Sequence, residues 1–213
     1  VDTTLQYHYG VRGKTKEIDM STSHTETITV QSYWTQGLVK NTNTGINYYK
    51  VQDAIDNASA GHTLNVWAWT YNEALEIDKS INLIGNSSST TKIVAGSEQY
   101  NSDLDSVIEI TSDEVTLRNL TIIQNATNFT YVIKSGNNDI TISNNIIDYW
   151  TSSAYGETAL YVFGDNFVIS NNSIYEAEWC IQLTDSDGHL VENNILGRDS
   201  GAEYYPSKCM FSL

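Results

Sequence analysis

The second half of the chain repeats one short phrase in which apolar and polar residues alternate. Four clear copies begin at residues 115, 140, 167 and 189, and a fainter copy begins at residue 81. Apolar side chains such as Ile140 and Ile142 recur at every second position, which is the period of a strand with one buried face. One copy is too short to bury that face alone, so the repeats predict the stacked coils of a β-solenoid.

A second strand is predicted ahead of each copy, because another set of apolar segments aligns between the phrases. These segments cover residues 107–110, 132–135, 159–162, 180–183 and 209–212. In each segment two residues, such as Ile108 and Ile110, point inward and the residue between them points outward. The outward residues form a stripe of Glu109, Lys134, Tyr161, Gln182 and Phe211.

One asparagine recurs at the same place in every clear copy. The four residues are Asn119, Asn144, Asn171 and Asn193. Asparagine tolerates the left-handed backbone conformation that a tight bend requires, and stacked amide side chains can bond from one layer to the next. We therefore expect these four side chains to form a ladder along one corner of the solenoid.

The repeated phrase Ile-x-Ile-x-Asn-Asn-x-Ile resembles that of right-handed parallel β-helix proteins of the pectate-lyase-like superfold. Residues 49–58 carry apolar side chains at helical spacing. They precede Thr-Leu-x-Val at 63–66 and Thr-Tyr-x-Glu at 70–73, a layout similar to the N-terminal cap of secreted prokaryotic and archaeal β-helix proteins. The resemblance implies an all-β, right-handed parallel β-helix of about five coils over residues 48–213, with a short capping helix at about 49–58.

Residues 1–47 lie outside the repeat and are interpreted as an N-terminal β extension. Two segments within it alternate like strands. Their apolar positions are Leu5, Tyr7, Tyr9, Ile28, Val30 and Tyr33. A polar region around residues 20–25 separates the two segments.

The last predicted strand runs directly into Leu213, so its outer edge has no later strand to cover it. Exposed strand edges recruit other strands. One hypothesis is that copies of the chain associate end to end, or that residues 1–47 donate a strand to a neighbour. Met210, Phe211 and Leu213 would then contribute to the interface, together with the apolar residues of the extension. The alternative is an edge that faces solvent or is covered by the chain's own extension.

Cys180 and Cys209 take the same position in consecutive predicted strands. Neighbouring strands lie about 4.8 Å apart, which suits the Cα separation of a disulfide. A disulfide here would hold the final strand and fits an oxidising exterior. Two reduced, packed thiols are the alternative.

The polar composition and the glycosylation sequons favour a protein outside the cell, and the charge argues against binding to nucleic acid. The net charge is −15, with 26 acidic and 11 basic residues, and no basic cluster could neutralise a phosphate backbone. The apolar runs are too short to cross a membrane. We expect an extracellular or cell-surface protein, exported by a signal peptide that this chain lacks. Candidate glycosylation sites are Asn57, Asn86, Asn119, Asn125, Asn128 and Asn171.

The sequence offers no catalytic constellation. A lyase of this superfold would need clustered carboxylates with a basic residue, and a hydrolase a suitable carboxylate pair. The lyase pattern is not evident. The candidate acids for a hydrolase lie in predicted loops and are interpreted first as solvated loop residues: Asp148, Glu157, Glu176 and Glu178. No metal site is predicted, and residues 185–188 only imitate the start of a calcium loop. Aromatic and acidic residues do gather in the predicted loops: Tyr149, Trp150, Tyr155, Tyr161, Tyr175, Glu176, Glu178 and Trp179.

These residues could form one wall that binds a glycan or a protein, or they could simply pack over the solenoid. The favoured function is an extracellular structural subunit that associates with copies of itself, for example as a filament, or mediates adhesion to a cell-surface target. The alternative is a glycan-binding module, or a polysaccharide lyase or hydrolase. No cofactor is expected beyond weakly indicated calcium.

Overall fold

The computed structural model describes residues 38–99, 104–126, 129–149, 158–197 and 210–212. The chain divides into two compact units, residues 1–33 and 34–213. All described residues belong to the second unit, and everything below concerns that unit alone.

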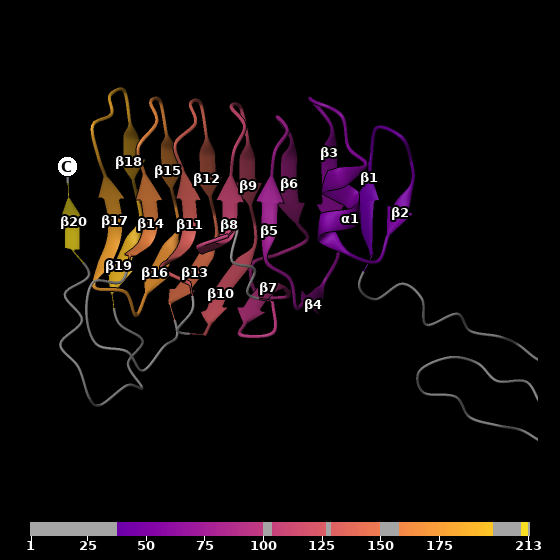
Figure 1. The fold of residues 1–213 in the computed structure, drawn as a ribbon, viewed down its shortest axis with the longest axis horizontal. Helices are drawn as coiled ribbons and strands as arrows, with labels where there is room; N and C mark the ends of the chain where they lie inside the picture. Colours follow the sequence, from indigo (N-terminus) through magenta and orange to yellow (C-terminus); the bar gives the residue numbers. More distant parts are fainter. Residues whose placement is uncertain (1–37, 100–103, 127–128, 150–157, 198–209, 213) are drawn as a thin grey trace, which may run out of the picture. The chain divides into compact units, whose positions relative to one another are not determined.

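The second unit is a right-handed parallel β-solenoid of about five turns, as the repeats predict (Figure 1). Each turn contributes one strand to each of three sheets. Sheet A contains β3 (Thr63–Val66), β6 (Asn82–Gly85), β9 (Thr116–Arg118), β12 (Thr141–Ser143), β15 (Val168–Ser170) and β18 (Leu190–Glu192). Sheet B contains β4 (Trp69–Tyr71), β7 (Thr91–Gly96), β10 (Thr121–Asn125), β13 (Ile146–Tyr149), β16 (Ser173–Tyr175) and β19 (Ile195–Gly197).

Sheet C holds the strands that the sequence places ahead of each phrase. It contains β5 (Leu75–Ile77), β8 (Ser106–Ile110), β11 (Tyr131–Ser135), β14 (Thr158–Val162), β17 (Trp179–Leu183) and β20 (Met210–Ser212). Its inward residues stack in register from coil to coil and are fully buried: Ile108, Ile133, Leu160 and Ile181. Such continuous apolar stacks are the source of the fold's stability, since each coil buries its neighbour's inner face.

The asparagine corner forms as predicted. The ladder of amide hydrogen bonds, however, is made by the asparagines that follow the predicted ones in the sequence. The backbone φ angles of Asn119, Asn144, Asn171 and Asn193 lie between 55° and 59°, so these residues do occupy the left-handed bend. Asn144 and Asn171 are exposed. Because the bend turns their side chains toward solvent, it is the following residue that turns into the corner.

The ladder consists of Asn145, Asn172 and Asn194. The backbone N–H of Asn145 donates to Oδ1 of Asn172 at 3.0 Å, and that of Asn172 donates to Oδ1 of Asn194 at 2.9 Å. Leu120 starts the ladder by donating its N–H to Oδ1 of Asn145 at 2.9 Å. Each Nδ2 donates in turn to a backbone carbonyl of the preceding coil. The amides thus satisfy backbone groups that the bend would leave unpaired.

The front of the solenoid is closed by the predicted helix and by a short antiparallel hairpin. The helix α1 (Val51–Asp56) buries Val51, Ala54 and Ile55. Ahead of it, β1 (Val39–Asn41) pairs antiparallel with β3, and β2 (Asn47–Tyr48) pairs with β1. The structure therefore assigns the end of the predicted extension, residues 38–47, to the solenoid rather than to a separate segment.

The final strand β20 forms and pairs in parallel with β17, although its register differs from the predicted one. Met210 lies opposite Trp179, and Phe211 lies opposite Ile181 with a register shift beside Cys180. The sequence alignment had placed Phe211 opposite Gln182, which instead faces Ser212.

Candidate functional site

The outward side of sheet C carries a group of polar and aromatic side chains. Its central ladder runs in register from Glu76 through Glu109, Lys134 and Tyr161 to Gln182. Parallel strands hold these residues about 4.8 Å apart. Together with Asp105, Tyr131 and Phe163, they form what we term the polar-aromatic face.

A lysine and two carboxylates form an ion cluster on this face. Nζ of Lys134 lies 3.0 Å from Oδ1 of Asp105 and 3.2 Å from Oε1 of Glu109. Burial acts to lower the pKa of Lys134, but the two carboxylates outweigh it and raise the pKa above its ordinary value. Lys134 therefore stays a cation, and it engages the two acids that a hydrolytic mechanism would otherwise draw on.

Three aromatic rings lie beside the ion cluster. The rings of Tyr131 and Tyr161 stack with centroids 4.8 Å apart and an interplanar angle of 14°. Phe163 follows at 5.4 Å from Tyr161 and is 41% exposed. It lies directly over Gly136, where an added Cβ would meet the Phe163 ring at 1.9 Å. Flat rings beside carboxylates and amides are the combination that a sugar recognises by stacking and by its hydroxyl groups.

Burial raises the pKa of Tyr131, and the neighbouring Tyr161 and Asp105 raise it further, while Lys134 opposes them. The Tyr131 hydroxyl therefore stays protonated at neutral pH and remains a hydrogen-bond donor. On the same sheet, Oγ1 of Thr158 donates to Oε1 of Gln182 at 3.2 Å. The hydroxyl and amide groups of the face thus add hydrogen-bond donors and acceptors beside the ion cluster.

The predicted aromatic wall is only partly assembled. Tyr149 is a core residue rather than a wall residue: it is 2% exposed, and its hydroxyl donates to the carbonyl of Phe129 at 3.2 Å. Trp179 lies in the same sheet as Tyr131. Tyr131 pairs with Thr158 of the next strand, and Thr158 pairs with Trp179 of the strand after that.

Tyr175 lies in sheet B, with Glu176 and Glu178 in the connection that follows, and all three are partly buried. Trp150 and Tyr155 lie outside the described residues.

Sequence reasoning missed Tyr131, Phe163 and Asp105. Tyr131 directly precedes one aligned segment and Phe163 directly follows another. Their positions beside the aligned strands could therefore have indicated that they belong to this surface.

The last coil forms a second candidate surface. We call β18 and β19, with the bend between them, the terminal coil; it spans residues 190–197. Within the part of the chain that the structure describes, no strand pairs with the outer edge of β18 or β19. Leu190 is 48% exposed and Ile195 is 61% exposed.

The inward residues of the terminal coil are also incompletely covered. Val191 and Leu196 are only partly buried, whereas the residues below them, Ile169 and Ile174, are fully buried. An apolar layer bordered by strand edges that no described strand pairs is suited to accept another strand.

Most of the residues predicted to form the assembly interface lie outside the described part of the chain. Leu5, Tyr7, Tyr9, Ile28, Val30, Tyr33 and Leu213 lie outside the described residues, and only the backbone of Met210 and Phe211 in β20 is described. Cys180 is fully buried, while Cys209 lies outside the described residues. The disulfide between them stays a prediction.

Four of the six candidate glycosylation sites are exposed: Asn57, Asn86, Asn125 and Asn171. Asn119 is partly buried, and Asn128 lies outside the described residues. Side-chain access for a glycan is thus present at the four exposed positions. Their occupancy stays a prediction.

The described residues contain neither a cluster of metal ligands nor a helix that could span a membrane. No group of three or more His, Cys, Asp or Glu side chains there could hold a metal ion. None of the described helices is long and apolar enough to cross a membrane. A hollow of about 280 Å³ at the ends of β3 and β6 is lined by residues without titratable groups: Asn65, Val66, Trp67, Ile84, Gly85 and Asn86. It offers no acid or base for catalysis.

Comparison with known proteins agrees with this fold. Residues 106–208 match the family model described as the right-handed β-helix region, so the chain is a protein with a right-handed parallel β-helix. No curated protein sequence matches the chain.

Among solved structures, a pectin methylesterase in complex with a hexasaccharide is similar with a TM-score of 0.60 and 16% identity, over 78% of this chain and 56% of that chain. A pectin methylesterase mutant with another hexasaccharide has a TM-score of 0.47 and 16% identity, over 68% of this chain and 52% of that chain. This chain thus spans little more than half of either structure. Likeness at this identity concerns the fold alone.

Proposed function

We propose that the protein is an extracellular structural subunit that associates with copies of itself through the terminal coil. The observation that carries the proposal is the exposed apolar layer on that coil, with Leu190 and Ile195 about half exposed or more. In the coil below, the residues in register with them are Val168 and Ser173, which are partly buried. A further coil stacked on the terminal coil would cover both apolar side chains to the same partial extent and would pair the edges of β18 and β19.

The chemistry of the remaining surface agrees with this role. Lys134 engages the carboxylates on the polar-aromatic face, and the described residues hold no metal cluster. Backbone pairing at an edge gives affinity, and the apolar side chains give register. Export to the cell surface belongs to the same proposal, since an assembling β-helix with a charge of −15 is suited to solvent outside the cell.

Replacing Leu190 and Ile195 together by lysine is expected to abolish self-association. Lysine on a strand edge opposes further pairing through its charge and hydration. Both side chains are already exposed, so the fold should be retained. In sedimentation velocity, the native chain should form species whose size grows with concentration, while the double variant should stay monomeric.

Phe163→Lys provides the matched control, because Phe163 is a similarly exposed apolar residue on an inner coil. This variant should associate like the native chain. A native chain that remains monomeric at every concentration would contradict the proposed function. Association of the Leu190→Lys, Ile195→Lys variant at the native level would exclude the terminal coil as the contact.

Carbohydrate binding is the second candidate, and the stacked Tyr131 and Tyr161 rings favour it. A polymeric acidic sugar would meet the acids of the polar-aromatic face, so a neutral glycan fits better. The related pectin methylesterase was solved with a hexasaccharide, which supports a sugar ligand for this fold.

The sugar hypothesis predicts that Tyr161→Ala weakens binding of neutral oligosaccharides by about five- to tenfold, because ring stacking contributes about 1 kcal/mol. A glycan array followed by calorimetry measures this. Tyr49→Ala is the control, since Tyr49 is an exposed tyrosine at the front of the solenoid and should not affect binding. The hypothesis fails if no neutral glycan binds the native chain.

A further inference from the structure

The hollow at the ends of β3 and β6 combines an exposed indole with neutral amide side chains. It measures about 280 Å³, and its lining includes Asn65, Trp67 and Asn86. Trp67 is 47% exposed. None of the lining residues is ionisable, so the hollow suits a small neutral group that combines an apolar face with hydroxyl groups. A sugar ring has this chemistry.

The backbone of Trp67 is held on both sides of its side chain. Its N–H donates to the carbonyl of Leu38 at 3.0 Å, and its carbonyl accepts the hydroxyl of Tyr71 at 3.1 Å. Burial raises the pKa of Tyr71, so this hydroxyl stays protonated and continues to donate at neutral pH. The indole therefore projects from a fixed backbone, and a ring that packs on it has less conformational freedom to suppress.

Asn86 lies beside Trp67 in the next coil. Val66 pairs in parallel with Gly85, and the backbone N–H of Asn86 donates to the carbonyl of Val66 at 2.9 Å. Asn86 thus lies opposite Trp67, one strand spacing or about 4.8 Å away. Both residues are exposed, and the residue before each is buried. The indole and the Asn86 side chain therefore point to the same outer side of the coils.

Asn86 is also the first residue of the N-glycosylation sequon at residues 86–88. The chain turns directly after it, where the N–H groups of Thr90 and Thr91 donate to the carbonyl of Ser87 at 3.1 and 2.8 Å. Within the described residues, the amide of Asn86 makes no hydrogen bond. Its Nδ2 is therefore free to carry a substituent.

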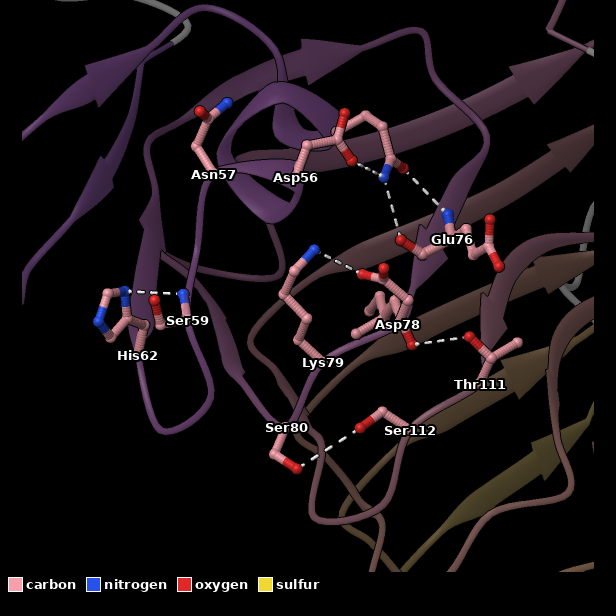
Figure 2. A network of polar contacts seen from close by, with 12 residues as sticks. Asp56, Asn57, Ser59, His62, Glu76, Asp78, Lys79, Ser80, Thr111 and Ser112 are labelled. Carbon is pink, nitrogen blue, oxygen red and sulfur yellow. Dashed lines mark hydrogen bonds and ion pairs between the residues drawn. The ribbon is translucent and has the colours of Figure 1, made fainter.

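Two other exposed sequon positions are tied into the fold. Asn57 lies at the end of α1 (Figure 2), where its Nδ2 donates to the carbonyl of Asp53 at 2.8 Å. Asn171 occupies a left-handed bend, and the next sequon residue, Asn172, is held in the ladder. Asn86, by contrast, lines a hollow beside an exposed indole.

We propose that Asn86 carries an N-linked saccharide whose first sugar ring packs on the Trp67 indole in this hollow. The linkage forms when Nδ2 of Asn86 attacks the anomeric carbon of a phosphate-activated saccharide. The amide loses one proton, and the phosphate group leaves with the bonding electrons. The amide of Asn65 can then donate to and accept from the sugar hydroxyls. The inference rests on the export that belongs to the proposed function, because saccharide transfer of this kind accompanies export.

The first experiment reads the occupancy of each sequon. The full-length chain is secreted from a host that performs N-linked glycosylation, and an amidase then releases the saccharides and leaves aspartate wherever one was attached. Peptide mass spectrometry should show this change at Asn86. An unmodified Asn86 in a preparation where another sequon is occupied would overturn the inference.

The second experiment tests the packing of the sugar on the indole. Ser88→Ala abolishes the sequon without altering Asn86 or the hollow, and it should lower the melting temperature of the glycosylated chain by about 2–4 °C. The same substitution should have little effect in a chain made without glycosylation. In the Trp67→Ala background Asn86 should remain glycosylated, but Ser88→Ala should no longer lower the melting temperature.

Trp69→Ala is the matched control, because Trp69 is 48% exposed and pairs with Thr91 rather than lying beside Asn86. In this background Ser88→Ala should act as it does in the native chain. An equal effect of Ser88→Ala with and without the Trp67 indole would overturn the packing. A chain that carries no saccharide at any sequon would overturn the whole inference, whereas the sedimentation experiment decides self-association separately.

Discussion

Gly164→Ala is expected to destabilise the solenoid by about 3 kcal/mol or more. An added Cβ at Gly164 would lie 2.0 Å from the carbonyl oxygen of Asn137 and 2.9 Å from the carbonyl carbon of Gly136. Both are backbone atoms of the preceding coil, so no rotamer change can relieve the overlap. The coils would have to move apart at this layer, and urea unfolding followed by circular dichroism measures the loss.

Gly85→Ala should behave in the same way, since its Cβ would meet the carbonyl oxygen of Asn119 at 2.1 Å. Gly197→Ala is the matched control, because no heavy atom lies within 4 Å of an added Cβ there. Its unfolding free energy should stay within about 0.5 kcal/mol of the native value. A Gly164→Ala protein as stable as the Gly197→Ala protein would contradict the close stacking of coils described above.

Asn145→Ala is expected to cost about 1–3 kcal/mol of unfolding free energy. The substitution removes the acceptor for the backbone N–H of Leu120 and one donor to the carbonyl of Leu117. The N–H of Leu120, a fully buried residue, would lose the hydrogen bond that satisfies it. Thermal and urea unfolding at neutral pH measure the effect.

The neighbouring residue Asn144 supplies the control. Asn144 is exposed and has a φ of 56°, a conformation that glycine adopts without strain. Asn144→Gly should therefore leave stability nearly unchanged, although it alters the same Asn-Asn pair. Equal destabilisation by both substitutions would show that the ladder does not carry the stability assigned to it.

The sequence was sufficient to predict the coils because period-two alternation and repeated phrases are local signals. Strands such as β9 and β12 pair in the register that the aligned phrases require. The ladder was predicted one residue too early, since two adjacent asparagines give no indication of which one takes the bend. The backbone decides this, because only the residue after the left-handed bend can point into the corner.

The candidate surfaces were harder to predict, for different reasons. Ile147 and Tyr149 share one face of β13, so alternation already indicated that Tyr149 is buried. Asp105 precedes its strand and reaches Lys134 from 29 positions away, a contact that no local pattern shows. The side-chain amide of Gln52 donates to the backbone carbonyl of Glu76 in β5 at 3.1 Å and accepts the backbone N–H of Glu76 at 3.0 Å (Figure 2). These bonds depend on where α1 lies against the sheet, which the spacing of apolar residues does not determine.

Electron microscopy of the purified native chain tests the central claim most directly, because it requires no assumption about a ligand. The account predicts assemblies larger than one copy, in which the copies meet at the terminal coil. Dispersed single copies at concentrations well above those in the sedimentation experiment would contradict it.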